Sequence, residues 1–539
     1  MRRISALLLT SILLLAAACH KDPPVPSVTP EAGTTVYGQI SCNGKGLPGV
    51  VVSDGYAVAV TGQDGVYQLK SDKKNGYVFV SVPSGYEVPV AGIIPQFYRH
   101  LNAPAARAER ADFALTEADQ SEYTMLFFGD IHLAGRSFCH DIDQFKEFTA
   151  DVREFIKGKK AYALTLGDMS WDVYWSSNGF DLPRYLSEMT EGLRGLPVFH
   201  TMGNHDNDKD QAGDFNAAGA FRTAIGPNWY SFNAGGIHYI VLDDVLYIND
   251  PLGERNFSAK VPDEELAWLR KDLSFVSKDT PLVLTSHVPF YRNDGSEYIR
   301  NVKEVLNVLK GYNVDLVSGH THVIVNTDLR SSDSFFERNA GAVCAAWWVS
   351  GSNYPGLLLC TDGTPGGYKA MTVKDNEIAS WQYKGTGRPE DYRMRTYDRN
   401  EVLLDSRWVS KTTADRQQEF LSTVGEYSKK STANEVLINA WDYDNDWTLT
   451  VTENGKELPV TRLKNAKDPL YLVTYEAYQL NNGYSISYPC EETGHIFKVT
   501  ASSPSSTLEI TLTDPYGRKS FETMTRPKPF TPSEYQGRH

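Results

Sequence analysis

After residue 19, the 539-residue sequence contains no apolar run that approaches the roughly 20 residues of a membrane-spanning helix. Cysteine is scarce: there are six, and no two of them form a CxxC pair of the kind that binds zinc. Basic residues are outnumbered, with 53 Lys and Arg against 67 Asp and Glu, for a net charge of −14. A polytopic membrane protein is therefore excluded. General nucleic-acid binding is disfavoured, because an acidic surface repels phosphate backbones.

The N-terminus has the pattern of an export signal. Arg2 and Arg3 precede an apolar stretch over residues 4–15, and three alanines then lead to Cys19. We predict a signal peptide over residues 1–18 and a proline-rich linker over residues 19–32. The segment resembles a bacterial lipoprotein signal, which implies that Cys19 is lipidated and that the exported protein touches the membrane only through this anchor, on its periplasmic or cell-surface face. An ordinary signal peptide that ends near a cysteine is the alternative.

The remaining cysteines give no disulfide framework. Without Cys19 they number five, at wide spacing, and an odd set of this kind indicates buried small apolar side chains. A bond between Cys344 and Cys360 is left open, since an oxidising compartment would allow it.

The two ends of the mature chain are rich in short β-strands. Residues 33–117 alternate β-branched runs with turns such as Asp54-Gly55 and Asp64-Gly65, which predicts a small N-terminal β-sandwich. Residues 345–525 return to strands, with Asn454-Gly455 as the strongest hairpin signal. We expect the C-terminal region to be an all-β domain.

Residues 121–340 have a different organisation, because strands alternate with helices. The predicted strands are 124–129, 161–166, 197–202, 237–242, 282–286 and 314–318, and the predicted helices are 143–157, 262–276 and 296–312. This alternation predicts an α/β domain. In such domains the functional groups gather beyond the carboxyl ends of the strands.

Five groups of potential metal ligands follow these strands. They are Gly129-Asp130-Ile131-His132, Gly167-Asp168, Gly203-Asn204-His205-Asp206, Ser286-His287 and Gly319-His320-Thr321-His322. Because strand ends of one parallel-type sheet meet at one rim, side chains this far apart in sequence can share a site. Carboxylate, amide and imidazole ligands suit divalent ions such as Zn, Mn, Fe, Co or Ni. Two such ions can hold a hydroxide for attack on phosphorus.

The order DxH, GD, GNHD, H and GHxH over about 200 residues resembles the calcineurin-like metallophosphoesterase family. The flanking β regions are also similar to domains of its bacterial members. The resemblance implies a calcineurin-like four-layer αββα sandwich, with two metal ions. One ion is held by Asp130, His132 and His322, and the other by Asn204, His287 and His320. It further implies that Asp168 bridges them, that His205 contacts the phosphate and protonates the leaving oxygen, and that Asp206 orients His205.

Three further residues are candidates for substrate contacts: Trp171, Tyr291 and Arg292. Trp171 stands three residues after Asp168, where purple acid phosphatases have a tyrosine, so an iron–tyrosinate site is not expected. Packing or surface roles are the alternatives for all three.

The sequence thus favours a metal-dependent hydrolase of phosphate mono- or diesters, with a phosphorylated small molecule, glycan or lipid as substrate. A nuclease, or a non-catalytic glycan- or partner-binding lipoprotein, remains the alternative.

Overall fold

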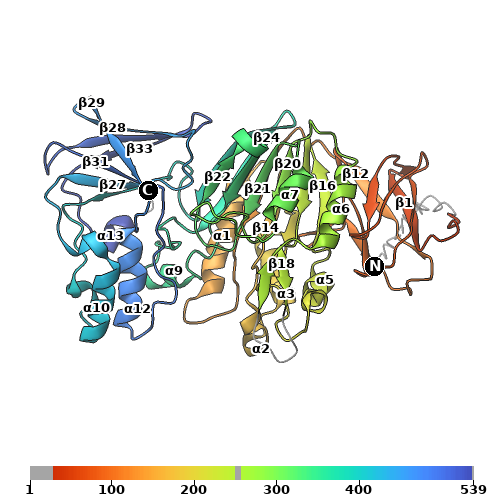
Figure 1. Cartoon of the computed structure of the whole chain (residues 1–539), viewed down its shortest axis with the longest axis horizontal. Helices are drawn as coiled ribbons and strands as arrows, with labels where there is room; N and C mark the ends of the chain where they lie inside the picture. The colour runs from red at the N-terminus through yellow and green to blue at the C-terminus, as the bar shows by residue number, and fades with distance from the viewer. Residues whose placement is uncertain (1–27, 249–255, 537–539) are drawn as a thin grey trace, which may run out of the picture.

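The computed structural model describes residues 28–248 and 256–536. The predicted signal peptide, Cys19 and most of the 19–32 linker lie outside these residues. Within the described part, none of the helices has the length and apolarity to cross a bilayer. The N-terminal, central and C-terminal regions lie in a row (Figure 1).

The N-terminal region contains two main β-sheets, as the sequence predicts, and a short strand pair of β8 (Val90–Ala91) and β9 (Ile94–Pro95). The first contains β1 (Val36–Cys42), β2 (Lys45–Gly46), β5 (Val66–Leu69), β7 (Tyr86–Glu87), β11 (Glu109–Arg110) and β12 (Phe113–Glu117). The second contains β3 (Val51–Ser53), β4 (Val58–Val60), β6 (Tyr77–Val80) and β10 (Tyr98–His100). β1 alternates buried and half-buried side chains along its length, which is the pattern of a strand with one face on a core. The region contacts the central domain, where the Trp229 indole donates to the Gly55 carbonyl.

Two sheets form the centre of the molecule. The first, in the order β15-β14-β13-β24-β25, contains β13 (Glu122–Phe128), β14 (Ala161–Leu166), β15 (Val198–Thr201), β24 (Gly367–Lys374) and β25 (Glu377–Gly385). The second, in the order β16-β17-β20-β21-β23-β22, contains β16 (Tyr230–Ala234), β17 (Ile237–Val241), β20 (Leu282–Thr285), β21 (Val314–Ser318), β23 (Phe335–Asn339) and β22 (Asn326–Leu329). β13, β14 and β15 are parallel, and so are β17, β20, β21 and β23.

Alternation along β13 shows how the layers stack. Leu126 and Phe128 pack in one buried cluster with helices α1 (Asp141–Phe155) and α3 (Leu182–Leu193). Met125 and Phe127 pack in the other, with the second sheet and with α6 (Asp263–Leu273) and α7 (Val302–Leu309). Opposite faces of a strand therefore meet helices on one side and a sheet on the other. The four-layer αββα sandwich is confirmed.

The motif strands end at one rim of this sandwich. β13, β14 and β15 are neighbours in one sheet and β20 and β21 in the other, and each is followed directly by one of the five ligand motifs. Parallel pairing brings the carboxyl ends together, as the sequence predicts.

Besides shifts of one to three residues at several other element ends, two predicted boundaries differ from the structure. The hairpin β24–β25 pairs with β13 and so completes a central sheet, although the sequence analysis assigned it to the region after residue 345. The helix predicted over 296–312 is shorter, because Tyr291 forms a β-bridge with Glu297 before it and Gly311 takes a left-handed φ of 86° after it.

The C-terminal region contains two further sheets. One contains β26 (Arg395–Asp398), β27 (Glu435–Asn439), β31 (Ile496–Thr500) and β30 (Val460–Leu463), and the other β29 (Lys456–Leu458), β28 (Thr448–Glu453), β32 (Leu508–Thr513) and β33 (Lys519–Met524). Their facing side chains, such as Ile438 and Ile510, share one core.

Helices cover the other face of the first C-terminal sheet, and the sequence analysis did not predict them. They are α9 (Val349–Asn353), α10 (Ala414–Thr423), α11 (Pro469–Tyr471), a π-helical turn (Leu472–Glu476), α12 (Ala477–Asn481) and α13 (Pro532–Tyr535). Most are too short to show a helical period in the sequence.

The core between the central sheets gives a test of the fold. Phe232 is buried and its ring stacks on Phe199 and Tyr239, with centroids 3.8 and 4.8 Å away. Replacing Phe232 by Ala is expected to lower the free energy of unfolding by about 3–5 kcal/mol, through lost burial and a cavity. Denaturant unfolding measures this. Phe521→Ala is the matched control, because Phe521 is 62% exposed on β33, and its effect should stay within about 0.5 kcal/mol. Equal losses in both variants would contradict the assignment of this core.

Candidate metal centre

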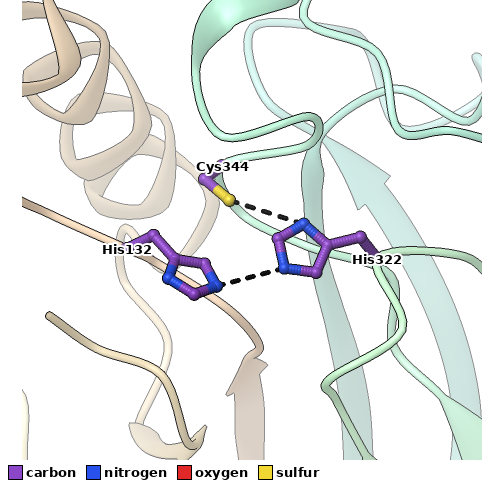
Figure 2. A group of neighbouring side chains, drawn as sticks. All are labelled: His132, His322 and Cys344. Carbon is purple, nitrogen blue, oxygen red and sulfur yellow. Dashed lines mark hydrogen bonds between the residues drawn. The ribbon is translucent and has the colours of Figure 1, made fainter. Parts of the chain in front are cut away.

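The predicted ligands of the first ion lie together. Nε2 of His132 is 3.1 Å from Nε2 of His322, and the two rings face each other through these atoms (Figure 2). Oδ1 of Asp130 is 3.4 Å from the same His322 nitrogen, and it is buried with no hydrogen-bond partner among the described residues. Two imidazole nitrogens and an unpartnered carboxylate oxygen at this separation form a donor set for a cation.

The predicted ligands of the second ion form a similar group. Nε2 of His287 is 3.0 Å from Oδ1 of Asn204 and 3.1 Å from Nδ1 of His320. All three side chains are held at the rim by loops that follow β15, β20 and β21.

One oxygen of Asp168 connects the two groups. Its Oδ2 lies 3.5 Å from Nε2 of His132 and 3.4 Å from Nε2 of His287. Ligands at bond lengths of about 2.0–2.2 Å around one ion are separated by roughly 3–3.5 Å, so these donors fit a metal in each group. The structure therefore brings all seven predicted ligands together, with Asp168 in the position of a bridge.

Hydrogen bonds fix which nitrogen of each imidazole faces the centre. Nδ1 of His287 is 2.8 Å from the Leu166 carbonyl, and Nδ1 of His322 is 2.6 Å from the Ala345 carbonyl. A carbonyl can only accept, so Nδ1 donates in both rings and Nε2 keeps its lone pair for a metal. His320 uses Nδ1 instead, and its Nε2 lies 3.1 Å from the Tyr298 hydroxyl.

The charges of the centre act strongly on one another. Burial alone would lower the pKa of His287, but Asp168 and Asp130 raise that pKa to about 10. Burial would raise the pKa of Asp168, but His287 and His205 lower it well below its ordinary value. Burial lowers the pKa of His132 well below its ordinary value. In the absence of metal, protonated His287 therefore balances the bridging carboxylate.

Left-handed backbone is concentrated at the predicted ligands. Asp130, His132, Asp168, His320 and His322 all have φ between 47° and 71°. Non-glycine residues in this region carry about 1–3 kcal/mol of strain each, which persists only where the surroundings impose it. Here the strained turns aim the side chains inward from the strand ends.

Glycine is required where the motif loops touch. A Cβ on Gly203 would lie 2.3 Å from the backbone nitrogen and Oδ1 of Asp168. A Cβ on Gly319 would lie 2.6 Å from Oδ2 of Asp130. These glycines let the loops approach closely enough for the ligands to share ions.

Cys344 also lies next to His322, but on the other side of the ring (Figure 2). Its Sγ is 3.7 Å from Nδ1 of His322, the nitrogen that donates to the Ala345 carbonyl. Burial raises the pKa of this thiol well above its ordinary value, which disfavours the thiolate that metals bind. Cys344 and Cys360 are both free thiols, so the disulfide that the sequence left open does not form.

The predicted partner of His205 is wrong. Nδ1 of His205 lies 2.9 Å from Oδ1 of Asp172, so Asp172 orients the ring. Asp206 instead accepts hydrogen bonds from the backbone N–H groups of Gly203, Met169 and Ser170, at 2.9, 3.0 and 3.3 Å. His205 and Asp206 are adjacent in the turn, and their side chains point in different directions. The Asp206 carboxylate therefore satisfies backbone N–H donors of the loops and does not contact the His205 ring.

The candidate substrate contacts lie on two sides of the centre. The Trp171 ring is 5.4 Å from the His132 ring and 5.6 Å from the His205 ring. Tyr291 and Arg292 line a separate cavity of about 320 Å³ that His320 also borders. The roles of these three residues in substrate binding stay predictions.

The sequence analysis missed several residues beside the centre. Tyr298 contacts His320, and Asp244 accepts hydrogen bonds from the backbone of His287 and Val288. Arg136 is buried, with its guanidinium 4.9 Å from the Trp171 ring. None of these residues lies in a recognisable sequence motif. Their place beside the centre is known only from their contacts in the structure.

We expect metal affinity to rise with pH. The raised pKa of His287 means that a cation must displace a proton, so the affinity should increase about tenfold per pH unit for each proton displaced, until the pH reaches that pKa. Titration calorimetry with Mn²⁺ or Zn²⁺ between pH 6 and 8, in buffers of different ionisation enthalpy, measures both the affinity and the protons released.

Two variants control this experiment. Asp168→Asn removes the bridging charge, so bound metal measured by elemental analysis should be lost. Asp143→Asn removes a carboxylate that is 76% exposed on α1, and metal content should not change. Stoichiometric metal in Asp168→Asn, or an affinity independent of pH, would contradict the proposed donor set.

Comparison with known proteins finds phosphatases that are similar to parts of this chain. Purple acid phosphatase 23 of Arabidopsis thaliana is 31% identical over 154 residues, which are 26% of this chain and 30% of that protein. Purple acid phosphatase 15 of the same plant is 29% identical over 170 residues, or 28% of this chain and 27% of that protein. The chain therefore spans less than a third of the length of either relative. A dimetal phosphatase from Danio rerio aligns with 48% of this chain and 94% of its own, at 14% identity and a TM-score of 0.35.

Three family models match successive parts of the chain. The N terminal of Calcineurin-like phosphoesterase matches residues 34–118, Calcineurin-like phosphoesterase matches residues 123–324, and the C terminal of Calcineurin-like phosphoesterase matches residues 337–520. Members of this family use a dinuclear metal centre, and the central model spans all seven of the converging ligands. The chain thus belongs to the calcineurin-like phosphoesterase family.

Proposed function

We propose that the protein is a two-metal hydrolase of phosphate mono- or diesters. The observation that carries this proposal is the single Asp168 oxygen that lies 3.4–3.5 Å from a ligand nitrogen of each donor group. Two ions held by these donor groups would lower the pKa of a bound water and offset the charge of a phosphate. The proposed substrate is a phosphorylated small molecule, glycan or lipid, and the family membership and the predicted export support this proposal.

His205 supplies the proton for the leaving oxygen. Asp172 receives its Nδ1–H, which fixes the ring and leaves Nε2 on the opposite side as the atom for proton transfer. Asp172 is buried and His205 partly buried, so the pair is held in one geometry. The His205 ring lies 5.2 Å from the His132 ring, measured between centroids, so the proton donor is next to the predicted ligands of the first ion.

His205→Ala should lower kcat by roughly 100-fold to 10,000-fold at unchanged metal content, because general acid catalysis is lost. Asp172→Asn should lower kcat by about 10- to 100-fold, because the ring loses its orienting charge. Hydrolysis of p-nitrophenyl phosphate and of its bis ester by the metal-loaded protein measures both effects and shows whether monoesters or diesters are preferred.

His140→Ala is the matched control, since this imidazole is 66% exposed and carries no proposed role. Wild-type protein that binds two metals but hydrolyses neither ester would refute the proposed activity. A kcat for His205→Ala equal to that of the wild type would refute the assigned proton donor, and an unchanged kcat for Asp172→Asn would refute its orienting partner.

We further propose that the enzyme is an exported lipoprotein anchored through Cys19. The support is the charged, apolar and small-residue pattern of residues 1–19. A single hydrocarbon chain gives only weak membrane binding, so stable anchoring requires the multiple acyl chains of a lipoprotein.

Metabolic labelling with an alkyne fatty acid is expected to mark the wild type and not Cys19→Ser, and the variant should leave the membrane fraction. Cys42→Ser, which removes a buried cysteine of β1, should keep the label. Labelled Cys19→Ser, or an unlabelled wild type in the soluble fraction, would contradict lipidation at this residue.

A further inference from the structure

A second cavity, of about 550 Å³, lies beside the metal centre and is here called the aromatic cleft. Trp171, Tyr174 and Trp347 line it from the central domain and the segment that follows. The C-terminal region contributes Tyr478, Tyr484 and others from α12 and the loop after it. Its volume lies within the roughly 300–1,000 Å³ range of small-molecule sites.

The cleft adjoins the proton donor. The Trp171 ring lies 5.6 Å from His205, and the Trp347 ring stacks on His322 at 3.9 Å. In a phosphate ester bound at the metals, the leaving oxygen must face His205. The group attached to that oxygen therefore extends toward Trp171 and the aromatic cleft.

The walls are fixed before any ligand arrives. Tyr488 stacks on Trp347 with centroids 3.5 Å apart, and the backbone carbonyl of Tyr488 accepts a hydrogen bond from the Tyr471 hydroxyl. The π-helical turn Leu472–Glu476 contributes Tyr475 to the lining, and such turns often mark functional sites. Rigid aromatic walls reduce the entropy lost on binding.

The lining has a distinctive chemistry. Among the described residues that line it there is no Asp or Glu, and the single cation, Arg136, is paired with Asp141 at 3.3 Å. Val349 is the one aliphatic side chain among these described lining residues, so the cleft offers little aliphatic surface to an acyl chain. Tyrosine hydroxyls, side-chain amides and serines surround the aromatic faces.

We propose that the aromatic cleft binds an uncharged sugar ring, and that the substrates are phosphorylated saccharides. A sugar presents apolar C–H faces to aromatic rings and hydroxyls to the surrounding amides and hydroxyls. A nucleobase would use the rings but offers hydrogen bonds only along its edge, and a lipid would use few of the polar groups. This inference rests on the proposed phosphoesterase activity for its catalytic meaning, but sugar binding itself needs no metal.

The test compares substrates that differ only in the leaving group. Hexose 1- and 6-phosphates should have kcat/KM values well above that of methyl phosphate, whose leaving group does not reach the cleft. Tyr484→Ala should lower the ratio of kcat/KM for a hexose phosphate to kcat/KM for methyl phosphate about tenfold. Tyr484 is 61% exposed, so the variant should fold. Tyr516→Ala, at an exposed turn that does not line the cleft, is the matched control and should leave the ratio unchanged.

Binding is measured separately in EDTA, through tryptophan fluorescence, with the same hexose phosphates. We expect saturable quenching that Tyr484→Ala weakens about tenfold and Tyr516→Ala does not. Turnover of methyl phosphate with a preference for adenosine monophosphate or dihexanoyl phosphatidic acid would overturn the saccharide assignment while keeping the phosphoesterase. Quenching without turnover of any ester would keep the cleft and refute the proposed activity. Equal effects of Tyr484→Ala and Tyr516→Ala would overturn the proposal that the aromatic cleft binds the sugar.

Discussion

The bridging carboxylate of Asp168 is the interaction on which the architecture of the site depends. One of its oxygens lies between His132 and His287, which come from different sheets of the sandwich. Any relative shift of the two sheets would separate the donor groups. The apolar contact between the sheets, of which the Phe199–Phe232 stack is one part, is therefore also what holds the metal ligands in register.

The site concentrates features that are unfavourable elsewhere in a protein. Imidazole nitrogens face each other at 3.1 Å, a buried carboxylate oxygen has no partner in the part of the chain that the structure describes, and five ligands adopt left-handed backbone. Each costs free energy in the protein alone, and a bound cation would relieve the electrostatic part of that cost. The rest of the domain has to be stable enough to impose this geometry, which fits the large shared core beneath the rim.

The C-terminal region takes part in the site and is not a separate appendage. Tyr488 stacks on Trp347, which in turn stacks on the ligand His322, so an aromatic column joins this region to the metal centre. The hairpin β24–β25 completes a central sheet just before this region begins. These contacts give the family's C-terminal domain a physical role: it forms one wall of the cleft into which the leaving group would extend.

The local sequence determined the α/β alternation of the central region and the five ligand motifs, because strand periodicity, turn glycines and ligand residues all lie within a few residues of one another. The four layers and the division of the ligands between two ions came from the resemblance to the family. Only the tertiary structure decided that Asp172, and not Asp206, orients His205, since neighbouring side chains of a turn point in different directions. It also decided the place of the hairpin β24–β25, the short C-terminal helices and the contact of Tyr298 with His320. Such features arise from packing between segments distant in the chain, and no local pattern records them.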